Sequence, residues 1–180
     1  MRSFALTLIS ALLVGCSTSA PTSVIPATPA PSASGQPSAQ AAQAAHVLPG
    51  GCGSTAVLNG GTPAWLDEAG AHNNPTGLPY VVASPINAAG FIFGYPLSAT
   101  QRQGTSNKIL WVVGVPRNGS SLEIKGHPLN SLTPTVRVIQ PANSSPGEIY
   151  PTIVDVPRPG CWHFDLVWSG NTTSVDLMYQ

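Results

Sequence analysis

The most informative part of this 180-residue chain is Cys161–Trp168, which reads CWHFDLVW. Side chains alternate between the two faces of a β-strand, so its bulky apolar residues share one face. That set is Trp162, Phe164, Leu166 and Trp168, and the opposite set is Cys161, His163, Asp165 and Val167. The run Ser174–Tyr179, which follows the polar segment Ser169–Thr172, alternates in the same way. We therefore predict a β-hairpin with one buried aromatic face.

The turn of this hairpin sets which residues face each other. Gly170-Asn171 fits a two-residue type II′ turn, in which glycine takes the first central position. That turn pairs Leu166 with Val175, Phe164 with Leu177 and Trp162 with Tyr179, and it places Asp165 opposite Asp176. A shift of one residue would turn the apolar side chains of the second strand toward solvent, so burial restricts the register.

In this register the carboxylates of Asp165 and Asp176 face each other. Like charges that face each other across a strand pair destabilise it, so their repulsion must be offset. Solvation or a neighbouring Arg137 would supply that compensation. The alternative is a weak cation site that combines both carboxylates with His163. Calcium needs six or more oxygen ligands, and the sequence offers no loop that supplies them. We therefore predict neither a metal nor a cofactor, and keep Asp165, Asp176 and His163 as weak candidates for a metal site.

From Gly51 onward the chain repeats short runs of β-branched and aromatic residues between clusters of Gly, Pro, Asn and Ser. This pattern predicts an all-β sandwich of about seven to eight strands, with one short helical turn at Thr62–Glu68. We expect Ile109–Val113 to form a central strand of a sheet, because its side chains are apolar on both faces. We expect Ile149–Val156 to be an edge strand, because it contains Pro151.

The segment from Pro157 to Tyr179, a proline-glycine corner followed by the aromatic hairpin, resembles the last two strands of an immunoglobulin-like sandwich. The resemblance implies an immunoglobulin-like β-sandwich as the fold. The sequence departs from antibody domains, because it lacks their Cys, Trp and Cys spacing. No binding function is therefore carried over from that family.

The N-terminal residues Leu13–Cys16 resemble the lipobox of bacterial lipoproteins at all four positions. The preceding apolar run Phe4–Val14 is shorter than the roughly 20 residues that a membrane-spanning helix needs. The resemblance implies a signal peptide over residues 1–15 and Cys16 as the first mature residue. A palmitate-type lipid on Cys16 would anchor the chain to the extracytoplasmic face of the cell membrane. An ordinary secretory signal with a chance cysteine is the alternative.

Residues 16–50 contain no Asp, Glu, Lys or Arg and are rich in Ala, Ser, Thr, Pro and Gln. Such a composition buries too little apolar surface to offset the entropy of folding, so we predict a disordered tether. The folded domain is expected over residues 51–180. The whole arrangement resembles bacterial surface lipoproteins that carry a small sandwich behind a low-complexity tether.

The chain has three cysteines. If Cys16 carries the lipid, Cys52 and Cys161 are left as a pair. Outside the cytoplasm such a pair forms a stable disulfide, which we predict here. Two free or intermolecular thiols are the alternative.

The charge balance argues against nucleic acid as a partner. Seven basic residues stand against seven acidic ones, and removal of Arg2 with the signal peptide leaves six against seven. So little positive charge makes no electrostatic case for binding phosphates. Ser120 and Ser121 lack the glycine-flanked turn of a nucleophile elbow, so we expect no enzyme activity.

A cupredoxin-like copper site needs two histidines, a cysteine and usually a methionine. His127, Cys161, His163 and Met178 are available, but only one residue separates Cys161 from His163, unlike that family's wider spacing. This spacing argues against a copper site.

Taken together, the lipobox resemblance and the absence of a catalytic motif predict a non-catalytic binding or structural module of the cell envelope, which contacts an envelope protein or a glycan. The loop aromatics Tyr95 and Tyr150 are candidates for a ligand surface. The alternative function is an extracytoplasmic metal-handling or hydrolytic protein.

Overall fold

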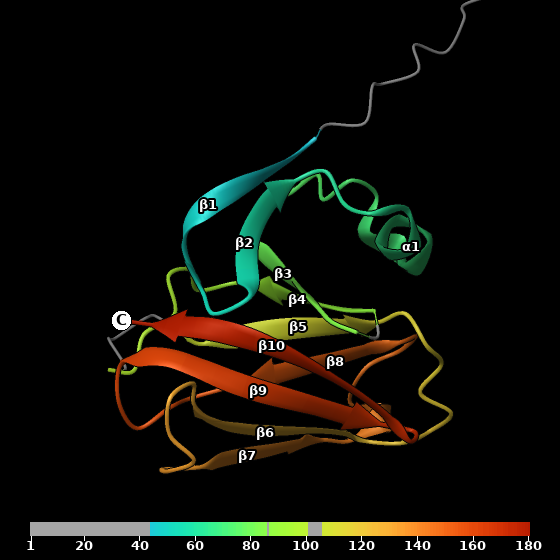
Figure 1. Ribbon diagram of the computed structural model, residues 1–180. Helices are drawn as coiled ribbons and strands as arrows, with labels where there is room; N and C mark the ends of the chain where they lie inside the picture. The colour runs from blue at the N-terminus through green and yellow to red at the C-terminus, as the bar shows by residue number, and fades with distance from the viewer. Residues whose placement is uncertain (1–43, 86, 101–105) are drawn as a thin grey trace, which may run out of the picture. The chain divides into compact units, whose positions relative to one another are not determined.

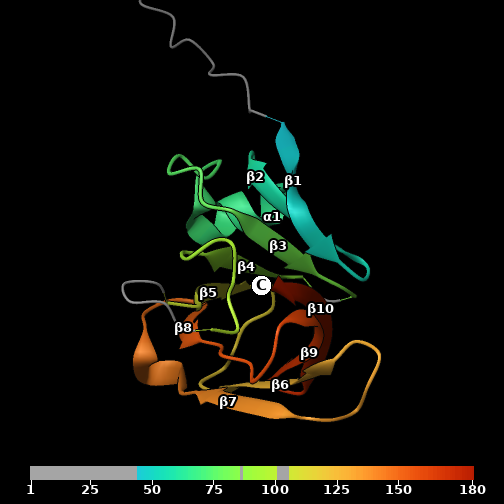
Figure 2. The same cartoon turned by 90° about the vertical axis from the view of Figure 1, so that its left-hand side faces the viewer.

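The structure, a computed structural model, describes residues 44–85, 87–100 and 106–180. These residues form two antiparallel β-sheets packed face to face, and the predicted all-β sandwich is confirmed. Figures 1 and 2 show the smaller sheet lying beneath the larger one. The predicted lipobox with Cys16 and most of the predicted tether lie outside the described residues.

The larger sheet has the strand order β1-β2-β3-β4-β5-β8, and the smaller sheet has the order β10-β9-β6-β7. The ten strands among the described residues are β1 (Ala45–Cys52), β2 (Thr55–Gly60), β3 (Tyr80–Ala83), β4 (Ala88–Ile92), β5 (Lys108–Val113), β6 (Leu122–Pro128), β7 (Val136–Gln140), β8 (Ile149–Ile153), β9 (Gly160–Trp168) and β10 (Asn171–Tyr179). A short helix, α1 (Ala64–Leu66), continues into a π-helical turn, η1 (Asp67–Ala71). A 3-10 turn, η2 (Ala142–Ser144), precedes β8.

Strands β4 to β10 have the connections of an immunoglobulin-like sandwich. β5 and β8 pair in the larger sheet, although β6 and β7, which separate them in sequence, lie in the smaller one. β9 then returns to pair with β6. These crossings between sheets are typical of immunoglobulin-like domains. β1, β2 and β3 extend the larger sheet beyond β4.

The predicted strand number and the predicted domain start are both wrong at the N-terminal end. The strands that the sequence pattern missed are β1 and β2. β1 begins at Ala45, within the predicted tether, and not at Gly51. Its side chains are mostly exposed, with Val47 71% accessible, so no buried alternation marks it in the sequence. Its pairing with β2 holds it in the larger sheet.

The β9–β10 hairpin has the predicted faces but not the predicted register. Its turn is Ser169-Gly170, so Asn171 pairs with Trp168 and every partner differs by two residues from the prediction. Both turn residues have positive φ, 45° at Ser169 and 76° at Gly170, as a type I′ turn requires. Because side chains alternate with a period of two, a slip of two residues keeps each one on its face. The buried set is therefore correct while the cross-strand partners are not.

Two apolar clusters cover the two faces of the larger sheet. The main core lies between the sheets and contains the four bulky residues of β9, each at most 1% exposed. In the second cluster Leu66 of α1 packs with Tyr80 and Val112 on the outer face of the larger sheet. β5 is therefore covered on both faces, as predicted for Ile109–Val113. β8, which contains Pro151, is an edge strand, also as predicted.

Candidate functional site

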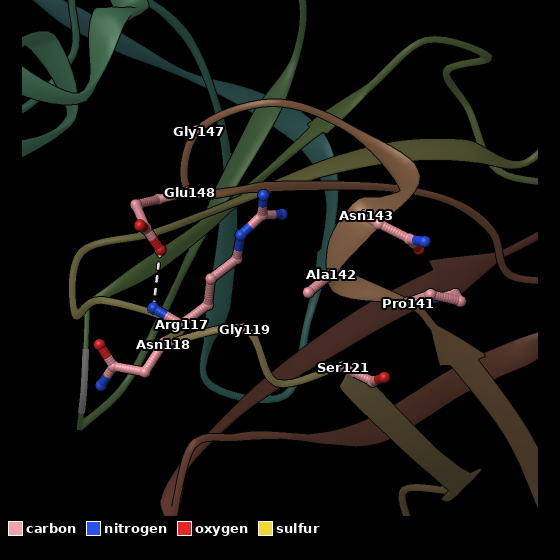
Figure 3. A pocket seen from close by; sticks show the side chains of 9 residues that line it. All are labelled: Arg117, Asn118, Gly119, Ser121, Pro141, Ala142, Asn143, Gly147 and Glu148. Carbon is pink, nitrogen blue, oxygen red and sulfur yellow. Dashed lines mark hydrogen bonds between the residues drawn. The ribbon is translucent and has the colours of Figure 1, made fainter. Parts of the chain in front are cut away.

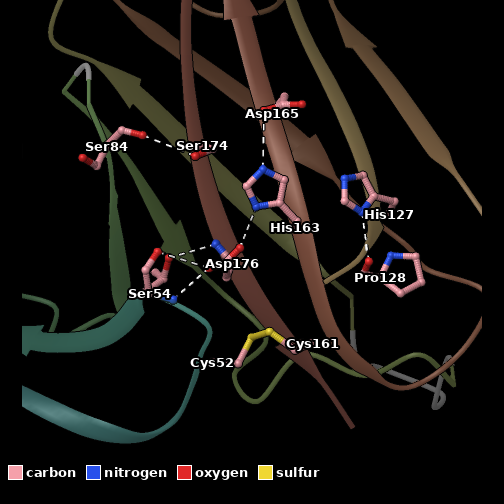
Figure 4. A network of polar contacts seen from close by, with 11 residues as sticks. Cys52, Ser54, Ser84, His127, Pro128, Cys161, His163, Asp165, Ser174 and Asp176 are labelled. Atoms are coloured by element: carbon pink, nitrogen blue, oxygen red, sulfur yellow. Dashed lines mark hydrogen bonds and ion pairs between the residues drawn. A yellow bond between two sulfur atoms is a disulfide. The ribbon is translucent and has the colours of Figure 1, made fainter. Parts of the chain in front are cut away.

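The candidate site lies on the face of the β9–β10 hairpin opposite to the aromatic core. In the observed register Asp176 is opposite His163, and Asp165 is opposite Ser174. The predicted pairing of the two carboxylates is therefore wrong. Figure 4 shows the imidazole of His163 between them, with Asp165 at one ring nitrogen and Asp176 at the other.

Asp176 is buried, with 5% of its surface exposed. One carboxylate oxygen accepts hydrogen bonds from the backbone N–H of Ser54 at 2.8 Å and from its hydroxyl at 3.2 Å. The other oxygen is 2.7 Å from Nδ1 of His163. Burial by itself raises the pKa of Asp176, but the hydrogen bonds from Ser54 and His163 outweigh it and hold the pKa below its ordinary value. The backbone N–H of Asp176 donates to the hydroxyl of Thr55 at 2.8 Å, so this residue joins β10 to the turn between β1 and β2.

A disulfide between Cys52 and Cys161 fastens the same turn, and the predicted pairing is confirmed. The two Cα atoms are 5.8 Å apart, and 109 positions separate the cysteines in sequence. Cys161 lies near the start of β9, two residues before His163. The disulfide and Asp176 therefore tie the N-terminal strands to neighbouring positions of one hairpin (Figure 4).

The hydrogen bonds of two neighbouring histidines determine which ring nitrogen carries the proton. An ionised carboxylate and a backbone carbonyl can only accept hydrogen bonds. Nδ1 of His163 therefore donates to Asp176, and Nδ1 of His127 donates to the carbonyl of Pro128 at 2.9 Å. His127 is the cross-strand partner of His163 on β6, and the ring centres are 5.4 Å apart.

The arrangement differs from a hydrolytic triad. In a Ser-His-Asp triad the serine hydroxyl gives its proton to the histidine that the aspartate orients. Here the hydroxyl of Ser54 donates to Asp176 itself, and Nε2 of His163 faces Asp165 at 3.5 Å. The geometry therefore orients an imidazole toward a second carboxylate and not toward a hydroxyl.

The cupredoxin-like ligand set is contradicted at Cys161, because its sulfur is bonded to Cys52 and offers no thiolate to copper. His127 and His163 do come together, and Met178 lies opposite Cys161 on β10. Among residues 44–85, 87–100 and 106–180, no group of three or more His, Cys, Asp or Glu side chains stands ready to hold a metal ion.

A shallow hollow of about 760 Å³ lies among the loops that follow β5 and β7. Figure 3 shows its polar lining, which comes from Arg117, Asn118, Ser121, Asn143 and Glu148. The guanidinium of Arg117 donates to the carbonyls of Ser145 at 2.8 Å and Ile149 at 2.9 Å, and its backbone N–H donates to Glu148 at 2.7 Å. Arg117 thus joins the two loops that form the hollow.

The two loop aromatics proposed as a ligand surface are engaged inside the protein. Tyr150 is fully buried, and its hydroxyl donates to the carbonyl of Ser120 at 2.7 Å. The hydroxyl of Tyr95, which is half-buried, donates to the carbonyl of Pro49 in β1. Tyr150 therefore belongs to the core, and Tyr95 holds β1 in place.

Sequence reasoning missed the groups that reach the site from the N-terminal turn. Ser54 lies 122 positions before Asp176, and Thr55 lies 121 before it. A polar pair at such a separation leaves no periodic signal in the sequence. Arg117 is also not identified by the sequence analysis.

Comparisons with protein-family models, with curated proteins and with solved structures find no match to this chain. The described helices are all too short or too polar to cross a membrane.

Proposed function

We propose that the protein is a lipoprotein of the bacterial cell envelope, held at the extracytoplasmic face of the cell membrane by a lipid on Cys16. Its sandwich domain acts as a non-catalytic binding or structural module. The partner is an envelope protein or a glycan.

The observation that carries this proposal is the disulfide between Cys52 and Cys161. Disulfides persist outside the cytoplasm and are rare inside it, so the bond supports export. Because it uses two of the three cysteines, it leaves Cys16, at the end of the lipobox-like stretch, as the thiol for a lipid. Two or three acyl chains would anchor such a chain stably.

The hollow lined by Arg117, Asn118, Ser121, Asn143 and Glu148 is the surface that best supports a binding role. Loops carried by a rigid sandwich are frequent binding sites. Its amide and hydroxyl groups both donate and accept hydrogen bonds, which suits a glycan or a peptide backbone. A flexible tether would raise the effective concentration of this hollow near its membrane.

The lipid anchor is tested by Cys16→Ser. Wild-type protein should fractionate with membranes and incorporate labelled palmitate, and the variant should do neither. Ser17→Ala, which keeps the cysteine, is the matched control and should behave as wild type. Membrane association and labelling that survive Cys16→Ser would overturn the anchor.

The binding surface is tested by photo-crosslinking in intact cells. A photoreactive residue at Asn143, in the hollow, should capture an envelope protein or a glycan. The same residue at Leu132, which is 76% exposed in the loop at the other end of β6, is the control and should not. Capture from both positions, or from neither, would contradict a binding role for the hollow.

A further inference from the structure

We propose that the open edge of β1 is an interface at which a second copy of this chain pairs strand to strand. The paired segment is Ala45–Leu48, and a two-fold axis at Val47 relates the two copies. This inference does not depend on the lipid anchor or on the hollow.

The first observation concerns the edges of the two sheets. A strand at an edge presents unpaired backbone groups, and proteins usually protect such strands. Three of the four edge strands among the described residues are protected. On β10 the backbone of Ser174 exchanges hydrogen bonds with that of Ser84, at 3.0 and 3.1 Å. β8 contains Pro151, which has no N–H to donate, and β7 exposes the charged side chain of Arg137.

β1 has none of these protective features over Ala45–Leu48. The segment contains no Asp, Glu, Lys, Arg or Pro, and its irregular pairing with β2 begins only after Leu48. Among the strands that the structure describes, it has a neighbour on one side only, and Figure 1 shows β1 at the margin of the larger sheet. The β-branched side chain of Val47 is 71% exposed there. An uncharged, apolar open edge is a template for another strand.

The second observation is a row of apolar side chains that crosses the outer face of the larger sheet and ends at this edge. Each member is the cross-strand partner of the next, and the row is Val47, Leu58, Tyr80, Phe91, Leu110 and Pro151. The four central members belong to or pack against the second apolar cluster. Val47 is therefore the exposed end of a row that is buried in the middle of the sheet, and one more apolar strand would extend it.

A second copy supplies a strand that fits this edge. Identical Ala45–Leu48 segments carry no like charges that would repel each other. A two-fold axis perpendicular to the sheet makes the outer face of one copy continuous with that of the other, as in an isologous dimer. Residues opposite each other in an antiparallel pair share a face. With the axis at Val47, this residue meets its own equivalent, His46 lies opposite Leu48, and the apolar row continues into the second copy.

The short paired segment makes the association weak and reversible. Stable interfaces bury about 1,200 to 2,000 Å² in total, and a strand pair as short as Ala45–Leu48 lies below this range. The dimer should therefore form and dissociate as the protein concentration changes.

The first test is analytical ultracentrifugation of the purified full chain. Cys16→Ser serves as the background, so that no free thiol can link two chains. The sedimenting mass should rise reversibly from one copy toward two as the protein concentration increases to about 1 mM. The mass of a single copy at every concentration would overturn the proposal, and the open edge would then serve a different partner or none.

Charge substitutions at position 47 test the two-fold axis. Val47→Lys and Val47→Glu each place two like charges opposite each other and should weaken association at least about tenfold. An equal mixture of the two variants should restore association, because the opposed charges then attract. Leu132→Lys is the matched control, since Leu132 is similarly exposed at 76% between β6 and β7, and it should associate as wild type does. Melting temperatures show whether each variant is folded. Association that survives Val47→Lys, or a mixture that stays monomeric, would contradict the axis at Val47.

Cysteine cross-linking tests the register. Opposed Cα atoms in an antiparallel pair are about 4.5 to 5.5 Å apart, a distance that a disulfide can span. In the Cys16→Ser background, Val47→Cys should therefore give a disulfide-linked dimer under mild oxidation. His46→Cys, at the next exposed position of β1, lies opposite Leu48 and should link much more slowly. If Val47→Cys links no faster than His46→Cys, the proposed pairing is wrong.

Discussion

Tyr179 is a buried hydroxyl that couples the stability of the fold to alkaline pH. Its side chain is 1% exposed, and its hydroxyl donates to the carbonyl of Val154 at 2.8 Å. Burial raises the pKa of this phenol far above its ordinary value, and the charge of nearby Asp155 raises it further. The folded protein therefore keeps the phenol proton at a pH where the unfolded chain has lost it.

The free energy of unfolding should fall as the pH rises above about 10, because the unfolded chain then binds fewer protons than the folded one. Tyr179→Phe removes this ionisation and should make the decline shallower. At neutral pH the same change should cost about 1 kcal/mol for the lost hydrogen bond. Urea unfolding at pH values of about 7 and about 11 measures both effects. Equal declines in the two proteins would mean that Tyr179 ionises freely in the fold.

Asp176 is tolerated in a buried position because its charge is compensated by hydrogen-bond donors. Its oxygens receive two donors from Ser54 and one from His163, so the charge is compensated where it is buried. Asp176→Ala would leave the N–H of Ser54 without this acceptor. We expect a loss of about 2 kcal/mol or more in the free energy of unfolding, measured by urea denaturation. Asp165→Ala, which alters the exposed carboxylate of the same hairpin, is the control and should cost less than about 1 kcal/mol. Equal losses would show that Asp176 does not hold the N-terminal turn.

Among the elements, the turn Ser169-Gly170 explains the register of the aromatic hairpin. A type I′ turn matches the right-handed twist of the strands that it joins and requires positive φ at both central residues. Ser169 and Gly170 both have positive φ. The turn therefore starts one position earlier than Gly170-Asn171, and the cross-strand pairs shift with it.

Gly170→Ala should reduce the free energy of unfolding by about 1 kcal/mol, because an L-residue is strained at this φ. A Cβ at this position meets no atom within 4 Å, so the cost is conformational and not steric. Ser169→Asn is the complementary change and should stabilise by a few tenths of a kcal/mol, because Asn-Gly favours this turn. Urea denaturation midpoints measure both. Opposite signs from those expected would contradict the type I′ turn.

β1 is the element that composition alone would assign to the tether. A chain that begins at Gly51 lacks most of β1, whereas one that begins at Gln40 keeps it. We expect the shorter chain to melt at lower temperature, because it loses the pairing with β2 and the contact of Tyr95 with Pro49. Thermal unfolding followed by circular dichroism measures the difference. Equal melting temperatures would show that β1 adds nothing to the fold.

At the scale of the whole molecule, the disulfide connects the N-terminal strands to the smaller sheet. A bond across 109 positions greatly restricts the unfolded chain. In the chain-entropy model the stabilisation is about 4 to 5 kcal/mol. The double substitution of Cys52 and Cys161 by Ala should therefore lower the free energy of unfolding by about 4 to 5 kcal/mol. Urea denaturation measures the loss, and reduced wild type is the control that should match the variant. An unchanged midpoint would show that the cysteines are not bonded in solution.

Features that depend on local periodicity could be predicted from the amino-acid sequence. The alternation in Cys161–Trp168 identified the buried face of the hairpin. Pro151 identified an edge strand, because proline has no backbone N–H to donate to a neighbouring strand. Clusters of turn residues between apolar runs identified the all-β class. The cysteine count, together with the lipobox resemblance, predicted the pair Cys52 and Cys161.

Features that depend on contacts between distant segments could not be predicted in this way and required the folded structure. A two-residue slip leaves a period-two pattern unchanged, so the sequence could not distinguish Val175 opposite Leu166 from Val175 opposite Phe164. β1 has no buried face of its own, and its contacts with distant segments order it: the pairing with β2, the bond from Tyr95 to Pro49 and the disulfide from Cys52 to Cys161. The candidate site also depends on contacts between distant segments. His163 meets Asp176 because of the register, and the two meet Ser54 because folding brings residues 122 positions apart into contact.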